Sequence, residues 1–290
     1  MHFDRARALP IIKAALKEDI GRGDITTQPL IDSLASSKAV IISREDCVVC
    51  GLEIAEMAMS EIDHSVRFKP NCKDGIFVGA NKDVAFIEGS TASILRAERT
   101  MLNFLTFLSG ISTRTKQYRD KVESYGVKIM DTRKTIPLLR YLEKYAVFTG
   151  GGANHRMGLY DQVLIKDNHI YCRKRNLPAG REFSLKGLVE EARKKNRKGT
   201  VVEIEVSTPE EFGDALQGKP DIIMLDNMGA RDIKACVEIR KLSKAKPLLE
   251  VSGGITLDTV EEYAETGVDM ISVGELTDSV RAIDMSLDLI

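Results

Sequence analysis

From residue 127 onward, short apolar runs alternate with segments whose apolar positions recur at helical spacing. Short apolar runs bounded by polar residues are typical of strands buried on both faces. Such strands are predicted at 127–130, 163–165, 201–206, 221–225, 248–251 and 269–273, and helices at 138–146, 209–216, 233–242 and 257–266. These six βα units favour a closed or nearly closed barrel over an open doubly wound sheet.

The first third of the chain has a different pattern. Residues 1–20 carry one apolar stripe, which predicts a helix, and residues 54–62 carry another. The runs at 39–42 and 84–87 predict strands. This mixture indicates a small α+β domain before the repeating part.

A long helix, apolar nearly all round, is predicted from Ser90 or Thr91 onward. Such a helix is normally buried, yet this one carries Arg96, Arg99 and Asn103 on one face. A buried arginine needs an anionic partner. Both an internal ion pair and a ligand or subunit-interface role for Arg99 remain open.

Composition and charge restrict the class of protein. The 290 residues include 42 Lys and Arg against 43 Asp and Glu, a formal charge of -1. This balance argues against a global nucleic-acid or acidic-membrane binder, and the basic stretch 171–198 is expected to be a solvated loop and helix face. Without an apolar run long enough to span a bilayer or a signal-peptide core, a cytoplasmic enzyme is expected.

The five cysteines are irregularly spaced. Cys47 and Cys50 form a CxxC pattern, which can ligate zinc, but the sequence shows no second CxxC or close His pair to complete a site. We therefore expect small, reduced core residues.

Polar chemistry is concentrated around the first two predicted strands of the barrel. The stretch 127–169 holds Asp131, Arg133, Lys134, His155, Arg156, Lys166, Asp167 and His169. Further on, the strand ends carry Glu205, Asp226, Asn227, Ser252, Gly253, Gly254 and Gly274. In a barrel these positions converge on one mouth, where ligands bind.

The converging residues form three arcs. The cationic arc suits anions such as carboxylates, Glu205 and Asp226 suit a hard cation such as Mg²⁺, and glycine-rich turns suit a phosphate. Alternatives remain: the SGG sequence is also a common turn, the two acids could pair with Lys166 or Arg133, and the histidines could be structural.

The ordered motifs resemble the quinolinate phosphoribosyltransferase family, the decarboxylating nicotinate-nucleotide pyrophosphorylases. The resemblance rests on EDIGRGDITT, AERTMLNFL, LSGIST, DTRKT, GGGANHRMGL, LIKDNH, VEIEV, LDN and EVSGG. It implies an α/β fold, with an N-terminal α/β sandwich domain (1–115) and an incomplete TIM-like α/β barrel (116–275). A C-terminal segment (276–290) would pack back on the N-terminal domain.

The resemblance also implies substrates and roles. Arg99, reaching across a homodimer or a higher oligomer of dimers, would bind quinolinate together with Arg133, His155 and Arg156. Lys134 and Lys166 would lie between quinolinate and the pyrophosphate of phosphoribosyl pyrophosphate. Glu205 and Asp226 would hold ribose hydroxyls and Mg²⁺, and the 5′-phosphate would lie against Ser252, Gly253, Gly254 and Gly274.

Some positions depart from the family's pattern. Ile136 and Leu138 stand where Thr and Gly are usual, Thr106 where Gln is frequent, and Phe148 where Arg is frequent. Three rival functions remain: a phosphoribosyltransferase that uses nicotinate or a related ring acid without decarboxylation, a Schiff-base aldolase with Lys166 as nucleophile, and a non-catalytic phosphate-ligand sensor.

Overall fold

The computed structural model of the protein describes residues 1–177 and 182–290. The chain divides into two compact units. The first comprises Met1–Lys116, Thr135–Gly152 and Leu276–Ile290, and the second comprises Gln117–Lys134 and Ala153–Glu275. Each unit therefore draws on segments that lie far apart in the sequence.

The first unit is built on an antiparallel sheet with the strand order β12-β1-β5-β3. The strands are β1 (Ser36–Ser43), β3 (Arg67–Pro70), β5 (Lys82–Ser90) and β12 (Met285–Leu289), and β2 (Cys47–Val48) pairs separately with β4 (Phe77–Val78). Pairing of β12 with β1 brings the C-terminal segment into this sheet. The helices that lie wholly in this unit are α1 (Arg5–Ile20), α2 (Thr27–Leu30), α3 (Leu52–Ile62) and α5 (Arg140–Thr149). Most of α4 (Thr91–Val122) and most of α11 (Glu275–Asp278) also belong to it.

The second unit is built on a parallel sheet with the order β6-β11-β10-β9-β8-β7 in the described part of the chain. The strands are β6 (Lys128–Met130), β7 (Val163–Ile165), β8 (Val202–Val206), β9 (Ile222–Asp226), β10 (Leu248–Ser252) and β11 (Met270–Ser272). The helices are α6 (Asp167–Arg175), α7 (Leu185–Lys195), α8 (Pro209–Gln217), α9 (Ala230–Leu242) and α10 (Val260–Ala264), and a 3₁₀ turn, η1 (Glu123–Tyr125), precedes β6. The predicted α/β fold with an incomplete barrel is confirmed.

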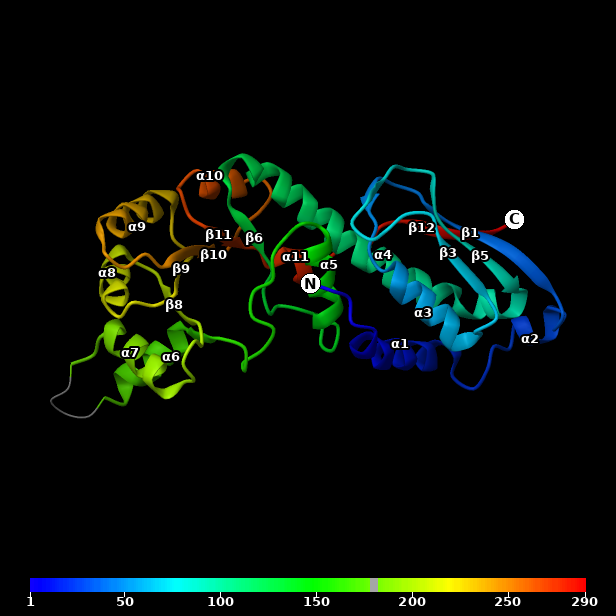
Figure 1. The fold of residues 1–290 in the computed structure, drawn as a ribbon, viewed down its shortest axis with the longest axis horizontal. Coiled ribbons are helices and arrows are strands. Elements are labelled where there is room, and N and C mark those ends of the chain that lie inside the picture. Colours follow the sequence, from blue (N-terminus) through cyan, green and yellow to red (C-terminus); the bar gives the residue numbers. More distant parts are fainter. Residues whose placement is uncertain (178–181) are drawn as a thin grey trace. The chain divides into compact units, whose positions relative to one another are not determined.

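Helices of the second unit lie along the outer side of its strands (Figure 1). Strand β8, with the sequence VEIEV, shows why: Val202, Ile204 and Val206 are buried and alternate with Glu203 and Glu205. Because successive side chains of a strand point to opposite faces, both acids share one face and the aliphatic residues share the other. The face without the helices is therefore the polar one.

The segment between β6 and β7 differs from its prediction. Helix α5 begins at Arg140, so Pro137 lies before it rather than in its first turn, and Leu138 has a left-handed φ of 70°. The helix belongs to the first unit, where Tyr145 packs against Phe3 with ring centroids 5.1 Å apart. Its aromatic face therefore finds partners at the N-terminus, although the segment had been predicted to lie inside the barrel domain.

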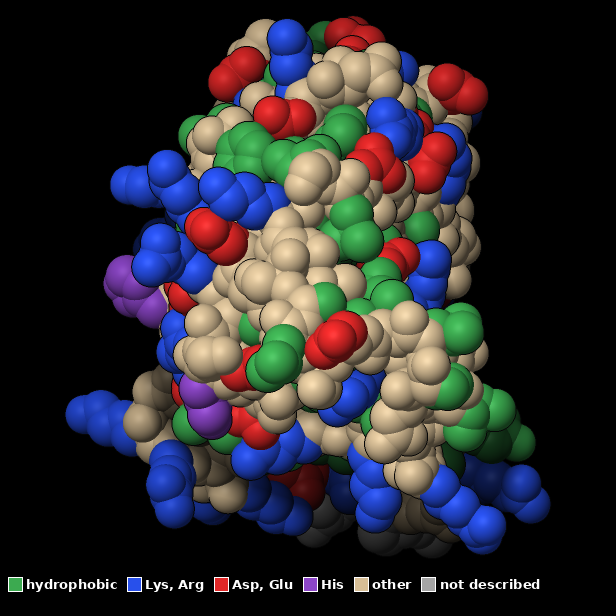
Figure 2. Space-filling view, turned by 90° about the vertical axis from the view of Figure 1, so that its right-hand side faces the viewer, with side chains coloured by type: hydrophobic (Ala, Val, Ile, Leu, Met, Phe, Trp, Pro, Cys, Tyr) green, Lys and Arg blue, Asp and Glu red, His purple; other side chains and the backbone are tan. Residues whose placement is uncertain are grey.

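The surface carries charges of both signs. On the face shown in Figure 2, acidic and basic side chains are mixed across the upper part, Lys and Arg predominate along the lower margin, and hydrophobic side chains lie between them. The basic stretch 171–198 includes residues 178–181, which lie outside the described residues. Among the described residues, none of the helices has the length and apolar character required to cross a bilayer.

Candidate active site

The ionic residues of the second unit gather where its parallel strands end. Strand β7 is followed by Lys166, β8 contains Glu205, and β9 ends at Asp226, which is in register with Ser252 of β10. Arg133 and Lys134 follow β6, and Gly274 follows β11. The carboxyl ends of parallel strands share one edge, so the structure brings these predicted residues to the same side of the sheet.

Arg99 lies on α4 in the first unit and is exposed, as is Asn103, whereas Arg96 is half-buried. The sequence left open an internal ion pair or a ligand or subunit-interface role for Arg99, and an exposed guanidinium is solvated by water. Its charge needs no internal partner.

A lysine and two carboxylates meet at the ends of β7, β8 and β9. The Lys166 ammonium nitrogen lies 2.6 Å from Glu205 Oε1. Burial raises the pKa of Glu205, the Lys166 ammonium opposes that rise, and the charge of Asp226 adds to it. The alternative of an ion pair with Lys166 is thus correct for Glu205, and Asp226 lies near enough to act on the same carboxylate.

Two arginines lie close together at the same edge. One of them, Arg156, is only 7% exposed. Burial lowers its pKa, and the positive charge of Arg133 lowers it further, while Glu203, Glu205 and Asp161 act in the opposite direction. Like charges held together in a partly desolvated place favour an anionic ligand between them.

Both histidines make local hydrogen bonds. The backbone N–H of Arg156 donates to His155 Nδ1 at 2.7 Å, and that of His155 donates to Asp131 Oδ1 at 2.8 Å. His169 Nδ1 accepts from the backbone N–H of Lys166 at 2.9 Å and so caps α6. His169 therefore has the structural role that the sequence left open as an alternative. The hydrogen bonds of His155 are in part structural as well.

The SGG turn is shaped by Asn227. The backbone N–H of Asn227 donates to the Ser252 carbonyl at 2.9 Å, and its side-chain amide donates to Asp226 Oδ2 at 2.8 Å. Gly253 has a φ of 101°, and a Cβ there would lie 2.2 Å from Asn227 Oδ1. Only glycine fits so close to that side chain, so the turn keeps its backbone accessible.

A buried acid cluster beneath the strand ends was missed by sequence reasoning. Glu203 and Glu250 are both fully buried, and His155 Nε2 lies 3.1 Å from Glu203 Oε2 and 3.6 Å from Glu250 Oε1. Gln162 Nε2 donates to Glu203 at 2.5 Å, and Ser272 Oγ donates to Glu250 at 2.5 Å. The available signal was an acid in each of two buried strands, VEIEV and LLEVS.

The cysteines follow their prediction only in part. Cys47, Cys50 and Cys236 are buried, Cys72 is half-buried and Cys172 is exposed, all as free thiols. Within residues 1–177 and 182–290, the groups close enough to hold a metal ion contain no cysteine. Three of the five are thus core residues, whereas Cys172 is at the surface of α6.

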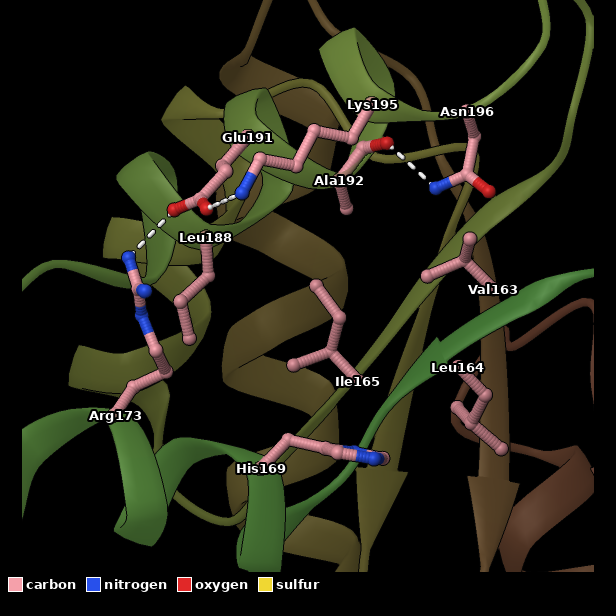
Figure 3. A pocket seen from close by; sticks show the side chains of 10 residues that line it. All are labelled: Val163, Leu164, Ile165, His169, Arg173, Leu188, Glu191, Ala192, Lys195 and Asn196. Atoms are coloured by element: carbon pink, nitrogen blue, oxygen red, sulfur yellow. Dashed lines mark hydrogen bonds and ion pairs between the residues drawn. The ribbon is translucent and has the colours of Figure 1, made fainter. Parts of the chain in front are cut away.

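A separate hollow of about 280 Å³ lies beside the edge strand β7 (Figure 3). Its wall is apolar, from Val163, Ile165 and Leu188. His169 lines it, whereas the residues assigned to the substrates do not. Arg173 and Lys195 on its rim lie 2.5 and 2.6 Å from the two carboxylate oxygens of Glu191. Its cations are therefore already neutralised, and the hollow is unlike the strand-end site in charge.

Known proteins share both units. The model of the quinolinate phosphoribosyl transferase N-terminal domain matches residues 24–109, and that of the C-terminal domain matches residues 111–288. A curated relative, the probable nicotinate-nucleotide pyrophosphorylase [carboxylating] of Methanocaldococcus jannaschii, is 40% identical over 98% of this chain and 97% of its own.

Solved structures agree with these matches. The nicotinate-nucleotide pyrophosphorylase of Francisella tularensis is 38% identical, with a TM-score of 0.91 over 100% of this chain and 98% of its own. NadC from Streptococcus pyogenes is 33% identical, with a TM-score of 0.92 over 100% of this chain and 99% of its own. Similarity along the full length, in sequence and in fold, shows that the chain belongs to the quinolinate phosphoribosyl transferase family.

Proposed function

We propose that the chain transfers the phosphoribosyl group of phosphoribosyl pyrophosphate to the ring nitrogen of quinolinate. The products are nicotinate mononucleotide, pyrophosphate and CO₂, a step of NAD biosynthesis. The observation that carries the proposal is the buried Arg156 beside Arg133, with Lys166 at the next strand end. Quinolinate has two adjacent carboxylates, and arginine binds carboxylates through two parallel hydrogen bonds.

The reaction asks the protein mainly to align two anions. The lone pair of the pyridine nitrogen forms the new bond to the anomeric carbon as the bond to pyrophosphate breaks. Lys134 and Lys166 stabilise the charge that develops on the departing pyrophosphate. The ring nitrogen is then cationic, so the carbon–carbon bond to the adjacent carboxylate can break with its electron pair left on the ring, where a proton replaces CO₂.

The strand ends have the donors that Mg²⁺ prefers. Glu205 and Asp226 offer carboxylate oxygens from neighbouring strands, and they act on each other electrostatically. Mg²⁺ needs only one or two carboxylates when substrate phosphates complete its shell. Bound there, it supplies positive charge to the pyrophosphate oxygens. The SGG turn, with Gly274, offers backbone N–H groups for the 5′-phosphate.

We also propose a homodimer in the cytoplasm, in which Arg99 reaches the partner's quinolinate. The exposed position of Arg99 supports this role, as do exposed apolar side chains of the first unit, Ile25, Leu30 and Leu34. Mixing Arg99→Ala chains with Lys134→Ala chains tests it. Activity above that of either variant alone is expected, and no recovery would contradict shared sites.

Incubation with quinolinate, phosphoribosyl pyrophosphate and Mg²⁺ tests the function. The mononucleotide and labelled CO₂ should appear in equal amounts, and nicotinate should not replace quinolinate. Turnover of nicotinate without CO₂ would favour the non-decarboxylating alternative. The aldolase alternative is disfavoured by the contact of Lys166 with Glu205, because an ion pair uses the ammonium form of a lysine and a Schiff-base nucleophile must be a free amine.

A further inference from the structure

Arg156 lies on a connection that we call the arginine loop (residues 154–162). The loop starts after Ala153, which bridges to Met130 of β6, and it ends where β7 begins at Val163. Loops are ordinarily more mobile than the strands they join. A guanidinium that must meet a planar carboxylate therefore needs something that fixes the shape of this loop.

One buried carboxylate contacts both ends of the arginine loop. Glu203 Oε2 lies 3.1 Å from His155 Nε2 near the start and accepts a hydrogen bond of 2.5 Å from Gln162 Nε2 at the end. Arg156 Nη1 donates across the loop to the Gln162 carbonyl at 3.1 Å. Glu203 itself is 0% exposed and lies on β8, which pairs with β7 on one side and with β9 on the other.

The tautomer of His155 follows from its neighbours. Nδ1 accepts the backbone N–H of Arg156, so the neutral ring carries its proton on Nε2 and donates it toward Glu203. His155 Nε2, Glu203 and Glu250 lie close enough together to hold a metal ion, since their ligand atoms are within 4.8 Å of one another. A metal would need the Nε2 lone pair, which the proton occupies, and this favours a hydrogen-bonded network over a metal site.

Asp131 also holds the start of the loop. Its two oxygens accept from the Asn154 side chain at 2.6 Å and from the His155 backbone at 2.8 Å. These bonds leave the end at Gln162 untouched. Glu203 contacts both the start and the end of the loop, and the bond from Arg156 to the Gln162 carbonyl spans the loop as well.

We propose that Glu203 is a positioning residue for the carboxylate subsite: it joins the two ends of the arginine loop and thereby holds Arg156 where quinolinate binds. The inference rests on the proposed function. Glu203 touches neither substrate in this proposal and acts through the loop. Loss of Glu203 should therefore weaken the binding of quinolinate more than the binding of phosphoribosyl pyrophosphate. The proposed partners of phosphoribosyl pyrophosphate lie at Glu205, Asp226 and the SGG turn.

Three variants separate this role from general stabilisation. Glu203→Gln keeps an oxygen that can accept both hydrogen bonds, and it removes only the charge. Glu203→Leu has a similar volume and removes the acceptor, so it frees both ends of the loop. Gln162→Met removes the donor at one end, at a position that is half-buried.

The measurements are the KM of each substrate, kcat, and the Kd of quinolinate by calorimetry, after wild-type turnover has been established. Glu203→Leu should raise KM and Kd for quinolinate about 10- to 100-fold, with the KM of phosphoribosyl pyrophosphate within about threefold. Glu203→Gln should recover most of the loss. Gln162→Met should weaken the binding of quinolinate by a smaller factor. The double variant should have a Kd for quinolinate no higher than that of Glu203→Leu alone.

Other outcomes would overturn the inference. Unchanged quinolinate affinity in Glu203→Leu, or equal losses for both substrates, would remove the positioning role. If Glu203→Leu does not fold, Gln162→Met decides alone, and an unchanged quinolinate KM in it contradicts the inference. A wild-type chain that neither binds nor turns over quinolinate would instead contradict the proposed function, and the inference would fall with it.

Discussion

The ammonium nitrogen of Lys166 and a carboxylate oxygen of Glu205 lie 2.6 Å apart at the ends of the paired strands β7 and β8. The Lys166 side chain is 45% exposed, so the pair contributes little to stability once solvent screening is included. The pair instead holds a basic and an acidic group side by side at the strand ends, where the lysine can bind an anion and the carboxylate can bind a cation.

Replacing Lys166 by Ala should therefore impair catalysis and leave stability nearly unchanged. We expect kcat to fall about 10²- to 10³-fold, because a charge that stabilises the leaving pyrophosphate is lost. The free energy of unfolding should change by no more than about 0.5 kcal/mol. Steady-state kinetics and urea titration check both numbers. A variant that retains wild-type kcat would exclude Lys166 from the reaction.

Arg133→Ala should reduce kcat/KM by roughly 2–4 kcal/mol, since a carboxylate of quinolinate would be left without its charged partner. Arg133→Lys is the matched control, because it keeps the charge and loses the planar two-point contact. It should fall between wild type and Arg133→Ala. An Arg133→Ala enzyme with near-normal kcat/KM would refute the assignment.

Glu250 should make stability depend on pH. Burial, and next the charge of Glu203, raise the pKa of Glu250 from 4.5 to about 8. The folded chain then holds a proton that the unfolded chain releases above its own pKa. The stabilisation is complete below pH 4.5 and is lost as the pH rises from there to about 8, at no more than about 1.4 kcal/mol per pH unit.

Glu250→Gln tests this dependence, because an amide cannot ionise. The difference in unfolding free energy between the variant and wild type should shift in favour of the variant between pH 5 and pH 8. Urea titrations at both pH values give that difference. A difference that stays constant across the range would show that Glu250 keeps an ordinary pKa.

Leu138→Gly should stabilise the chain. Leu138 has a φ of 70° and is 89% exposed, so its side chain packs little while its backbone is strained. Relief of that strain, less the extra freedom of glycine in the unfolded chain, should add about 0.5–1 kcal/mol. Leu138→Ala keeps the strain and should change the unfolding free energy little. Equal effects of the two substitutions would argue against backbone strain.

The parallel barrel was predictable because its strands are short apolar runs separated by helices of regular spacing. The location of helix α5 was not predictable. Its amphipathic pattern indicates that one face is buried, but it does not indicate which unit covers that face. Its partners, such as Phe3, lie more than a hundred residues away in the sequence. A contact at that separation leaves no local pattern.

The candidate site shows the same division. Residues just after a strand, such as Lys166 and Asp226, could be placed at one edge from the strand period alone. Glu203 could not be distinguished from Glu205 in role, because the two share a face and differ only in depth. The role of Arg99 stayed open, because a helix that is apolar nearly all round does not tell whether the face with Arg99 is covered or exposed to solvent.

The pairing of β12 with β1 has a consequence for how the chain is made. Residues 285–289 are synthesised long after Ser43, yet they form the neighbour of the strand that ends there. A ribosome must therefore add all of the intervening residues before this sheet acquires its β12 edge. Until then β1 offers unpaired backbone groups to other nascent chains, and termination before residue 285 would leave that edge without its partner.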